Sequence, residues 1–240
     1  RRQRQMCIRD SPYHRPAMKL NLNEAICVNN FSVWYGVSQV LSDISFTIQK
    51  RTVTALVGTA KSGKSTLLRS FNRVNKSTGY CRSEGTITFG GCFLNRKKLR
   101  RHVGILFTIP NPIPISIRRN VLFGLGISNQ YPYGDEADVV VEETLRKVLL
   151  WDAVKDKLRE TALSLSTEEQ RKLCLARLLL VNPEIVLLDE PLALFSPMMQ
   201  AVVKNFIYSV WKDQTVVLTA HHKNEFVGVQ SIFISGGRKV

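Results

Sequence analysis

The sequence predicts an α/β domain with a mostly parallel β-sheet and helices on both faces. Apolar runs typical of buried strands alternate with amphipathic segments of helical spacing. A glycine-rich loop at 58–66 separates one strand from a helix, and another strand ends in two adjacent acids at 189–190. With 240 residues and 44% hydrophobic composition, the chain is long enough to bury one substantial core.

Each element is predicted from its local pattern. The segment Gly134–Leu150 carries acids at its start and Arg146 and Lys147 near its end, as the helix dipole favours. The other expected helices are Thr66–Val74 and Thr167–Leu180. Apolar or alternating runs predict strands at Ala25–Tyr35, Val40–Ile48, Thr52–Val57, Gly85–Phe89, Val103–Phe107, Ile185–Leu188, Thr215–Thr219 and Ser231–Ser235.

The glycine-rich loop fits the pattern G-x-x-x-x-G-K-[ST] of phosphate-binding loops, between the strand and the helix that this motif requires. Its backbone N–H groups and the helix start form an anion-binding nest, so an ordinary glycine turn is the weaker reading. Lys64 is expected to reach the β- and γ-phosphates and Ser65 to ligate Mg²⁺. The predicted nucleotide-binding residues are Gly58, Thr59, Ala60, Lys61, Ser62, Gly63, Lys64, Ser65 and Thr66.

The acidic pair lies where ligands bind in open α/β sheets, at the carboxyl end of a strand. We expect Asp189 to hold the Mg²⁺ shell and Glu190 to polarise the attacking water. Two acids at a strand end are often only the start of a solvated loop. Together with the loop at 58–66, they predict a site for ATP and Mg²⁺.

Bulk properties leave the partner open. The net charge of +15 favours an anionic partner, which is a nucleotide, a nucleic acid or an acidic lipid surface. The five cysteines are odd in number and lack metal-ligand spacing, which indicates reduced thiols in the cytosol. No apolar run has the length of a bilayer span, so we expect a soluble or peripheral protein. Residues 1–23 are expected to be a disordered basic tail and residues 24–240 the folded domain.

The order of these motifs resembles the ATP-binding subunit of ABC transporters, and within that family the phosphate importers of the PstB group. The resemblance is carried by WYG at 34–36, VTALVG…GKSTLLRSFNRVN at 53–75, VGILF…PNPIPISIRRNV at 103–121, LSLS…QRKLCLARLLLVNPE at 163–184 and LLDEP at 187–191. It implies a P-loop NTPase core of the RecA type, an N-terminal antiparallel β subdomain, and an inserted helical subdomain at about 110–178. It also implies a second ATP-binding subunit, transmembrane permease subunits, and a peripheral place on the cytoplasmic face of the cell membrane.

The resemblance implies further roles for single residues. Tyr35 would stack on the adenine, although an edge aromatic packed on the sheet is the alternative. His221 would contact the γ-phosphate, although a lone histidine is often structural. The segment Pro110–Arg118 would contact a coupling helix of the permease.

The chain departs from the family pattern at three places. Thr108 stands where the family has the Gln that ligates Mg²⁺, and its side chain is shorter. Ser196 replaces an aspartate that links the two nucleotide sites of a dimer. The signature L-S-G-G-Q, which closes over a partner's ATP, is LSTEE here, with Ser166, Thr167, Glu168 and Glu169 after the leucine.

The altered signature fits a capping box, in which Ser166 caps the third helical N–H and Glu169 folds back onto the Ser166 N–H. Donors meant for a partner's ATP would then be satisfied internally, and two carboxylates would repel a triphosphate. The resulting hypothesis is a subunit with impaired hydrolysis, in a homodimer or, preferably, in a heterodimer with an intact partner. A soluble ABC-class ATPase that acts on nucleic acid is the less favoured alternative.

Overall fold

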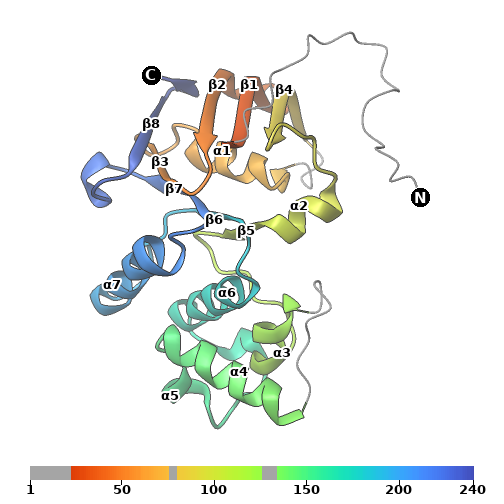
Figure 1. The fold of residues 1–240 in the computed structure, drawn as a ribbon, viewed down its shortest axis with the longest axis vertical. Helices are drawn as coiled ribbons and strands as arrows, with labels where there is room; N and C mark the ends of the chain where they lie inside the picture. Colours follow the sequence, from red (N-terminus) through yellow and green to blue (C-terminus); the bar gives the residue numbers. More distant parts are fainter. Residues whose placement is uncertain (1–22, 76–79, 126–133) are drawn as a thin grey trace.

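In the computed structural model, residues 23–75, 80–125 and 134–240 are described, and they form two β-sheets (Figure 1). The expected tail therefore lies outside the described residues except for Asn23. The strands are β1 (Glu24–Tyr35), β2 (Ser38–Gln49), β3 (Val53–Val57), β4 (Cys81–Phe89), β5 (Val103–Leu106), β6 (Ile185–Leu188), β7 (Thr215–Ala220), β8 (Gln230–Ser235) and β9 (Arg238–Lys239).

The larger sheet is mostly parallel, which confirms the predicted fold class. Its order is β5-β6-β7-β3-β8-β9, and only β9 runs antiparallel to its neighbour. Every residue of β6 and β7 is buried, because both faces of the sheet are covered. The smaller sheet has the order β2-β1-β4 with antiparallel pairing, which confirms the N-terminal antiparallel subdomain.

Helix α1 (Lys64–Phe71) packs between the two sheets. Leu67, Leu68 and Phe71 join a hydrophobic cluster to which both sheets contribute. The ring of Phe71 meets the ring of Phe46 on β2 edge-on, with centroids 6.4 Å apart. This packing fixes the start of α1, and with it the loop that precedes the helix.

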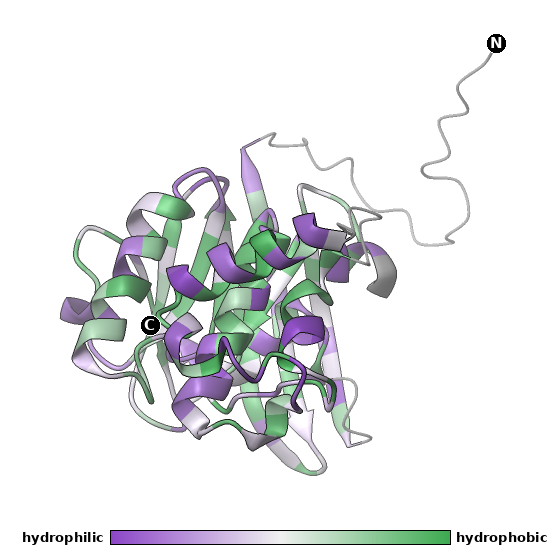
Figure 2. Ribbon diagram, turned by 90° about the horizontal axis from the view of Figure 1, so that it is seen from below, coloured by the Kyte–Doolittle hydropathy of each residue, from purple (hydrophilic) through white to green (hydrophobic). Residues whose placement is uncertain are grey.

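A second hydrophobic cluster joins the opposite face of the sheet to a group of helices. It includes α6 (Thr167–Val181), α7 (Pro197–Asn205), α3 (Ile117–Leu122), α4 (Gly134–Lys147) and α5 (Trp151–Val154). Figure 1 shows α3, α4, α5 and α6 gathered at the end away from the antiparallel sheet. The central strands are largely hydrophobic, whereas hydrophilic segments lie along the outer helices (Figure 2). The helices expected at 110–178 therefore share one continuous core with the sheet.

Several short elements were not predicted. They are the helices α2 (Arg96–His102), α3, α5 and α7, the 3₁₀ helices η3 (Ala162–Ser164) and η5 (Lys223–Glu225), the π-helix η4 (Phe206–Val210) and the strand β9. Leu99 is the only buried side chain among those described in α2. The basic sequence of this helix therefore lacks the repeated apolar positions from which a helix is predicted. Among the helices described, none combines the length and the apolar character needed to cross a bilayer.

Candidate functional site

The predicted loop Gly58–Thr66 follows β3 directly, and its last three residues form the first turn of α1. Gly63 caps the helix with a φ of 101°, which an L-residue rarely adopts. A Cβ on Gly58 would lie 2.1 Å from the carbonyl oxygen of Ile234, so only glycine fits there. The hairpin of β8 and β9 also supports the loop, because the N–H of Gly237 donates to the Ser62 carbonyl at 3.2 Å.

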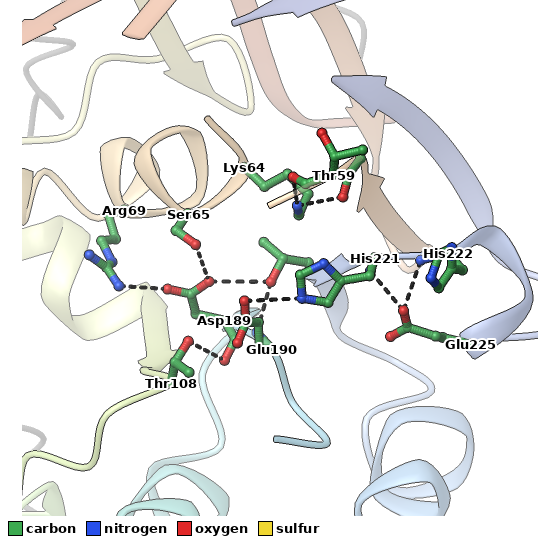
Figure 3. A network of polar contacts seen from close by, with 12 residues as sticks. Thr59, Lys64, Ser65, Arg69, Thr108, Asp189, Glu190, His221, His222 and Glu225 are labelled. Atoms are coloured by element: carbon green, nitrogen blue, oxygen red, sulfur yellow. Dashed lines mark hydrogen bonds and ion pairs between the residues drawn. The ribbon is translucent and has the colours of Figure 1, made fainter. Parts of the chain in front are cut away.

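The Lys64 side chain is buried inside the loop. Its Nζ donates to the carbonyl oxygens of Gly58 at 2.6 Å and Thr59 at 2.7 Å (Figure 3). Burial lowers the pKa of Lys64, while the nearby charges of Glu190 and Asp189 act in the opposite direction. The ammonium group is thus held beside the loop backbone, where an anion bound in the nest would meet it.

Asp189 follows β6 and is fully buried beneath the loop. Its carboxylate accepts hydrogen bonds from Ser65 Oγ at 2.7 Å and Thr219 Oγ1 at 3.2 Å. It also forms an ion pair with Arg69 Nη2 at 2.9 Å (Figure 3). The structure therefore brings together Ser65 and Asp189, two of the three oxygen ligands predicted for Mg²⁺, of which Thr108 is the weak third. Arg69 was missed, although it lies one helical turn after Ser65 and so shares its face.

Glu190 has a φ of 47°, a left-handed conformation that is unfavourable for a residue with a side chain. Its N–H donates to Thr219 Oγ1 at 2.7 Å, which helps to hold this backbone. Its Oε1 lies 3.4 Å from His221 Nε2, so these two predicted residues face each other (Figure 3).

The backbone around His221 is fixed by Glu225. The carboxylate of Glu225 accepts the N–H groups of His221 at 2.7 Å and of His222 at 2.8 Å (Figure 3). Sequence reasoning missed Glu225, whose only signal is its spacing of four residues from the histidine. An open hollow joins this region to the loop, and it is lined by Val57, Gly58, Thr59, Ala60, His221, His222, Lys223 and Phe233.

Tyr35 is half-buried at the end of β1, where it lies opposite Cys81 of β4 and close enough to Thr66 for that side chain to affect the Tyr35 pKa. Burial is the main cause that raises the pKa of Tyr35. Its contact with Thr66 places the ring beside the last residue of the loop. In the loop itself Thr59, Ala60 and Lys61 are exposed, and the buried Oγ of Ser62 has no hydrogen-bond partner among the described residues.

The Ser166–Glu169 segment begins α6 and forms the predicted capping box. Ser166 Oγ accepts the N–H of Glu169 at 3.4 Å, and Glu169 Oε2 accepts the N–H of Ser166 at 2.9 Å. Burial opposes ionisation of Glu169, but hydrogen bonds from Ser166 and nearby lysine charges outweigh it and lower the pKa. Glu168 pairs with Lys172 at 3.3 Å and accepts the N–H of Ser196 at 3.4 Å.

Comparison with known proteins assigns the chain to a family. The family model described as "ABC transporter" matches residues 41–193. The chain belongs to the ABC transporter family. It is 41% identical over 226 residues to "Phosphate import ATP-binding protein PstB 1" of Yersinia pestis bv. Antiqua (strain Antiqua), covering 90% of this chain and 82% of that protein. It is 38% identical over 205 residues to "Phosphate import ATP-binding protein PstB" of Cytophaga hutchinsonii, covering 82% and 81%.

Solved ABC structures share the fold. An ATP-bound bacterial Atm1-family ABC exporter matches with a TM-score of 0.76 at 21% identity, covering 97% of this chain and 40% of that one. An ATP-binding subunit of an ABC transporter matches with a TM-score of 0.74 at 18% identity, covering 90% and 88%.

Membership of the ABC family implies ATP binding, and the loop fits that ligand. A backbone nest is lined by a glycine with no room for a Cβ, a buried lysine amine, and a Ser62 hydroxyl that has no hydrogen-bond partner in the described part of the chain. The paired oxygens of Ser65 and Asp189 are of the kind that Mg²⁺ prefers.

Thr108 lies in the loop after β5, next to Asp189 of the candidate nucleotide site. Its Oγ1 donates to the carbonyl oxygen of Asp189 at 3.2 Å, so the side chain is turned toward the backbone (Figure 3). The Thr108 carbonyl accepts a hydrogen bond from Arg171 on α6. Sequence reasoning missed Arg171, because its burial depends on tertiary packing and leaves no local pattern.

Proposed function

We propose that this chain is the ATP-binding subunit of an ABC importer for phosphate and that it acts as a low-activity partner in a heterodimer. The import of phosphate is supported by two relatives near 40% identity whose names describe that activity. The observation that carries ATP binding is the convergence of the loop with the strand end, where Ser65 Oγ lies 2.7 Å from Asp189. ATP-driven dimer closure would be coupled to transport.

Each group of the site has a proposed task. Residues 58–66 would surround the phosphates with N–H groups, with Lys64 neutralising the β- and γ-phosphates. Ser65 and Asp189 would hold Mg²⁺, which offsets phosphate charge, and Thr108 would be at most a weak additional ligand. Glu190 would polarise the attacking water and His221 would contact the γ-phosphate. Tyr35 would stack on the adenine.

The proposed low activity is supported by the start of α6. Its capping box uses the Ser166 hydroxyl and the Glu169 N–H within the subunit. Glu168 and Glu169 add negative charge where a partner's triphosphate would approach. At about 4 Å and an effective dielectric constant near 20, one full charge pair costs on the order of 4 kcal/mol before screening. A homodimer would place this repulsion over both nucleotides, whereas a heterodimer leaves one composite site with an intact partner signature.

The proposed membrane partner is a permease, contacted through Pro110–Arg118 at the cytoplasmic face of the membrane. Within this segment Asn111 contacts Arg177 and Cys174 of α6 at 3.4–3.7 Å, and Ile113 is bonded to Asn120 of α3 at 2.9 Å. The segment is thus tied to two helices that share the core with the site. Force from nucleotide closure could pass along this packed path.

Calorimetric titration of Mg-ATP into the purified chain tests the proposal. Wild type should bind, and Lys64→Ala should weaken binding at least about tenfold, because a charge-assisted phosphate contact is lost. Lys147→Ala, which removes an exposed lysine at the end of α4, is the matched control and should bind like wild type. Absence of binding by folded wild-type protein would reject the proposal. Brisk steady-state hydrolysis by the chain alone would reject the low-activity part.

A further inference from the structure

Arg171 is a fully buried arginine on α6 that the proposed reaction has not used. Its guanidinium donates to the carbonyl oxygens of Glu190 at 2.6 Å, Asp189 at 3.4 Å and Thr108. These carbonyls belong to the loops that follow the neighbouring strands β6 and β5. The central carbon of the guanidinium also lies over the ring of Phe195, 5.0 Å from the ring centroid. One side chain therefore ties the helix to both loops.

Backbone carbonyls accept the hydrogen bonds of the buried Arg171 guanidinium, and no carboxylate among the described residues forms a direct ion pair with it. Burial lowers the pKa of Arg171 to about 10, while Asp189 and Glu190 act in the opposite direction, so the group stays protonated at neutral pH. A planar guanidinium can donate to several diverging acceptors at once, which a lysine ammonium on a flexible stem does less well. A buried guanidinium that lost these carbonyl acceptors would be strongly destabilised, so the hydrogen bonds of Arg171 are costly to break.

The contact with Glu190 has a consequence for the site. Glu190 is held in its unfavourable left-handed conformation from both sides, with its N–H on Thr219 and its carbonyl on Arg171. Such a conformation persists only where its surroundings over-determine it. It also sets the direction of the Glu190 side chain, whose Oε1 lies 3.4 Å from His221. Loss of the carbonyl contact would release the peptide that aims this carboxylate.

We infer that Arg171 is a positioning residue for ATP hydrolysis, which fixes the Glu190 carboxylate and ties the Thr108 loop to α6. This inference rests on the proposed function, because it assigns Glu190 to the attacking water. Arg171 contacts two loops of the site and the helix whose first turn holds Ser166–Glu169. Movement of that helix would therefore shift the Glu190 and Thr108 backbones together. The phosphate loop is held by other contacts, so nucleotide affinity should not depend on Arg171.

The test compares Arg171→Gln and Arg171→Lys with wild type in three measurements. They are the Mg-ATP dissociation constant, single-turnover hydrolysis, and hydrogen exchange of peptides covering 106–112 and 188–196. For Arg171→Gln we expect a dissociation constant within about threefold of wild type and a loss of hydrolysis on the order of a hundredfold, as for a misplaced catalytic group. Exchange in both peptides should rise about tenfold as local opening becomes easier. Arg171→Lys should lie between the two.

Arg146→Gln is the control, since it makes the same substitution at an exposed arginine of α4 and should match wild type. The inference would be overturned if both Arg171 variants exchanged hydrogen and hydrolysed ATP at the wild-type rates. An increase in dissociation constant as large as the loss of hydrolysis would also overturn it. If Arg171→Gln does not fold, Arg171→Lys decides alone. Wild-type protein that fails to bind Mg-ATP would instead reject the proposed function, and exchange would still show whether Arg171 holds the two loops.

Discussion

The carboxyl end of the parallel sheet and the start of α6 both carry groups of the kind that meet a triphosphate, but those groups are used differently. At the sheet, the Lys64 amine donates to a carbonyl oxygen of the loop, and the Ser65 hydroxyl donates to the Asp189 carboxylate. Bound Mg-ATP could replace both contacts. At α6, Ser166 and Glu169 are bonded in a closed pair within one turn. We interpret the carboxyl end of the sheet as arranged to bind a ligand, and the start of α6 as arranged to stabilise its own helix.

The largest effect should come from the sheet region. Replacing Glu190 with Gln keeps the shape of the side chain and removes the proposed base, so hydrolysis should fall about 10²- to 10⁴-fold with little change in Mg-ATP affinity. Single-turnover hydrolysis and calorimetry measure the two quantities. The comparison would break if Glu190→Gln hydrolysed ATP at the wild-type rate.

The second largest effect should come from removing the negative charges at the start of α6. The double change Glu168→Gly with Glu169→Gln removes both carboxylate charges, while the amide oxygen of the new glutamine can still accept the Ser166 N–H. ATP-dependent self-association should then strengthen more than tenfold, since even part of the repulsion exceeds about 1.4 kcal/mol. Analytical ultracentrifugation with Mg-ATP gives the association constant. Equal association of wild type and the double variant would show that repulsion does not limit closure.

A smaller effect isolates the cap itself. Ser166→Ala should lower the free energy of unfolding by about 1 kcal/mol, because the Glu169 N–H loses its acceptor. Denaturant unfolding followed by circular dichroism measures this change. Thr161→Ala, which removes a comparable hydroxyl contact at η3, gives a reference in the same part of the molecule. If Ser166→Ala left the free energy of unfolding unchanged, the cap would not contribute to the stability of α6.

The smallest effect is the pH dependence of that cap. Because the pKa of Glu169 is lower in the folded protein, its stabilisation is fully present above the unfolded pKa and is lost as pH falls through the folded pKa. The difference in unfolding free energy between wild type and Glu169→Gln should thus be largest at neutral pH. It should shrink in the acid range below the ordinary glutamate pKa. Unfolding curves at pH 7 and in that acid range test this; a constant difference would contradict it.

Sequence reasoning succeeded where a feature is set by neighbouring residues. The loop at 58–66 and the cap at 166–169 follow from local spacing, and both are present in the structure. It failed for Arg69, Arg171 and Glu225, whose partners are brought near by the fold. Arg171 is the clearest case, because a charged residue in an exposed helix and one at the centre of a core have the same local pattern. Short helices such as α2, with a single buried leucine, are missed for lack of apolar periodicity.

The hydrogen bond between Gly237 and Ser62 joins the phosphate loop to residues more than 170 positions away in the chain. Gly237 also accepts the N–H of Ser42 at 2.8 Å, so one tight turn touches the loop and β2 together. In a variant whose exposed Cys92 is replaced by serine, an environment-sensitive dye on position 238, after replacement of the exposed Arg238 by cysteine, would therefore report loop rearrangement optically without labelling any ligand-binding residue. The same turn is a poor place for a bulky affinity tag.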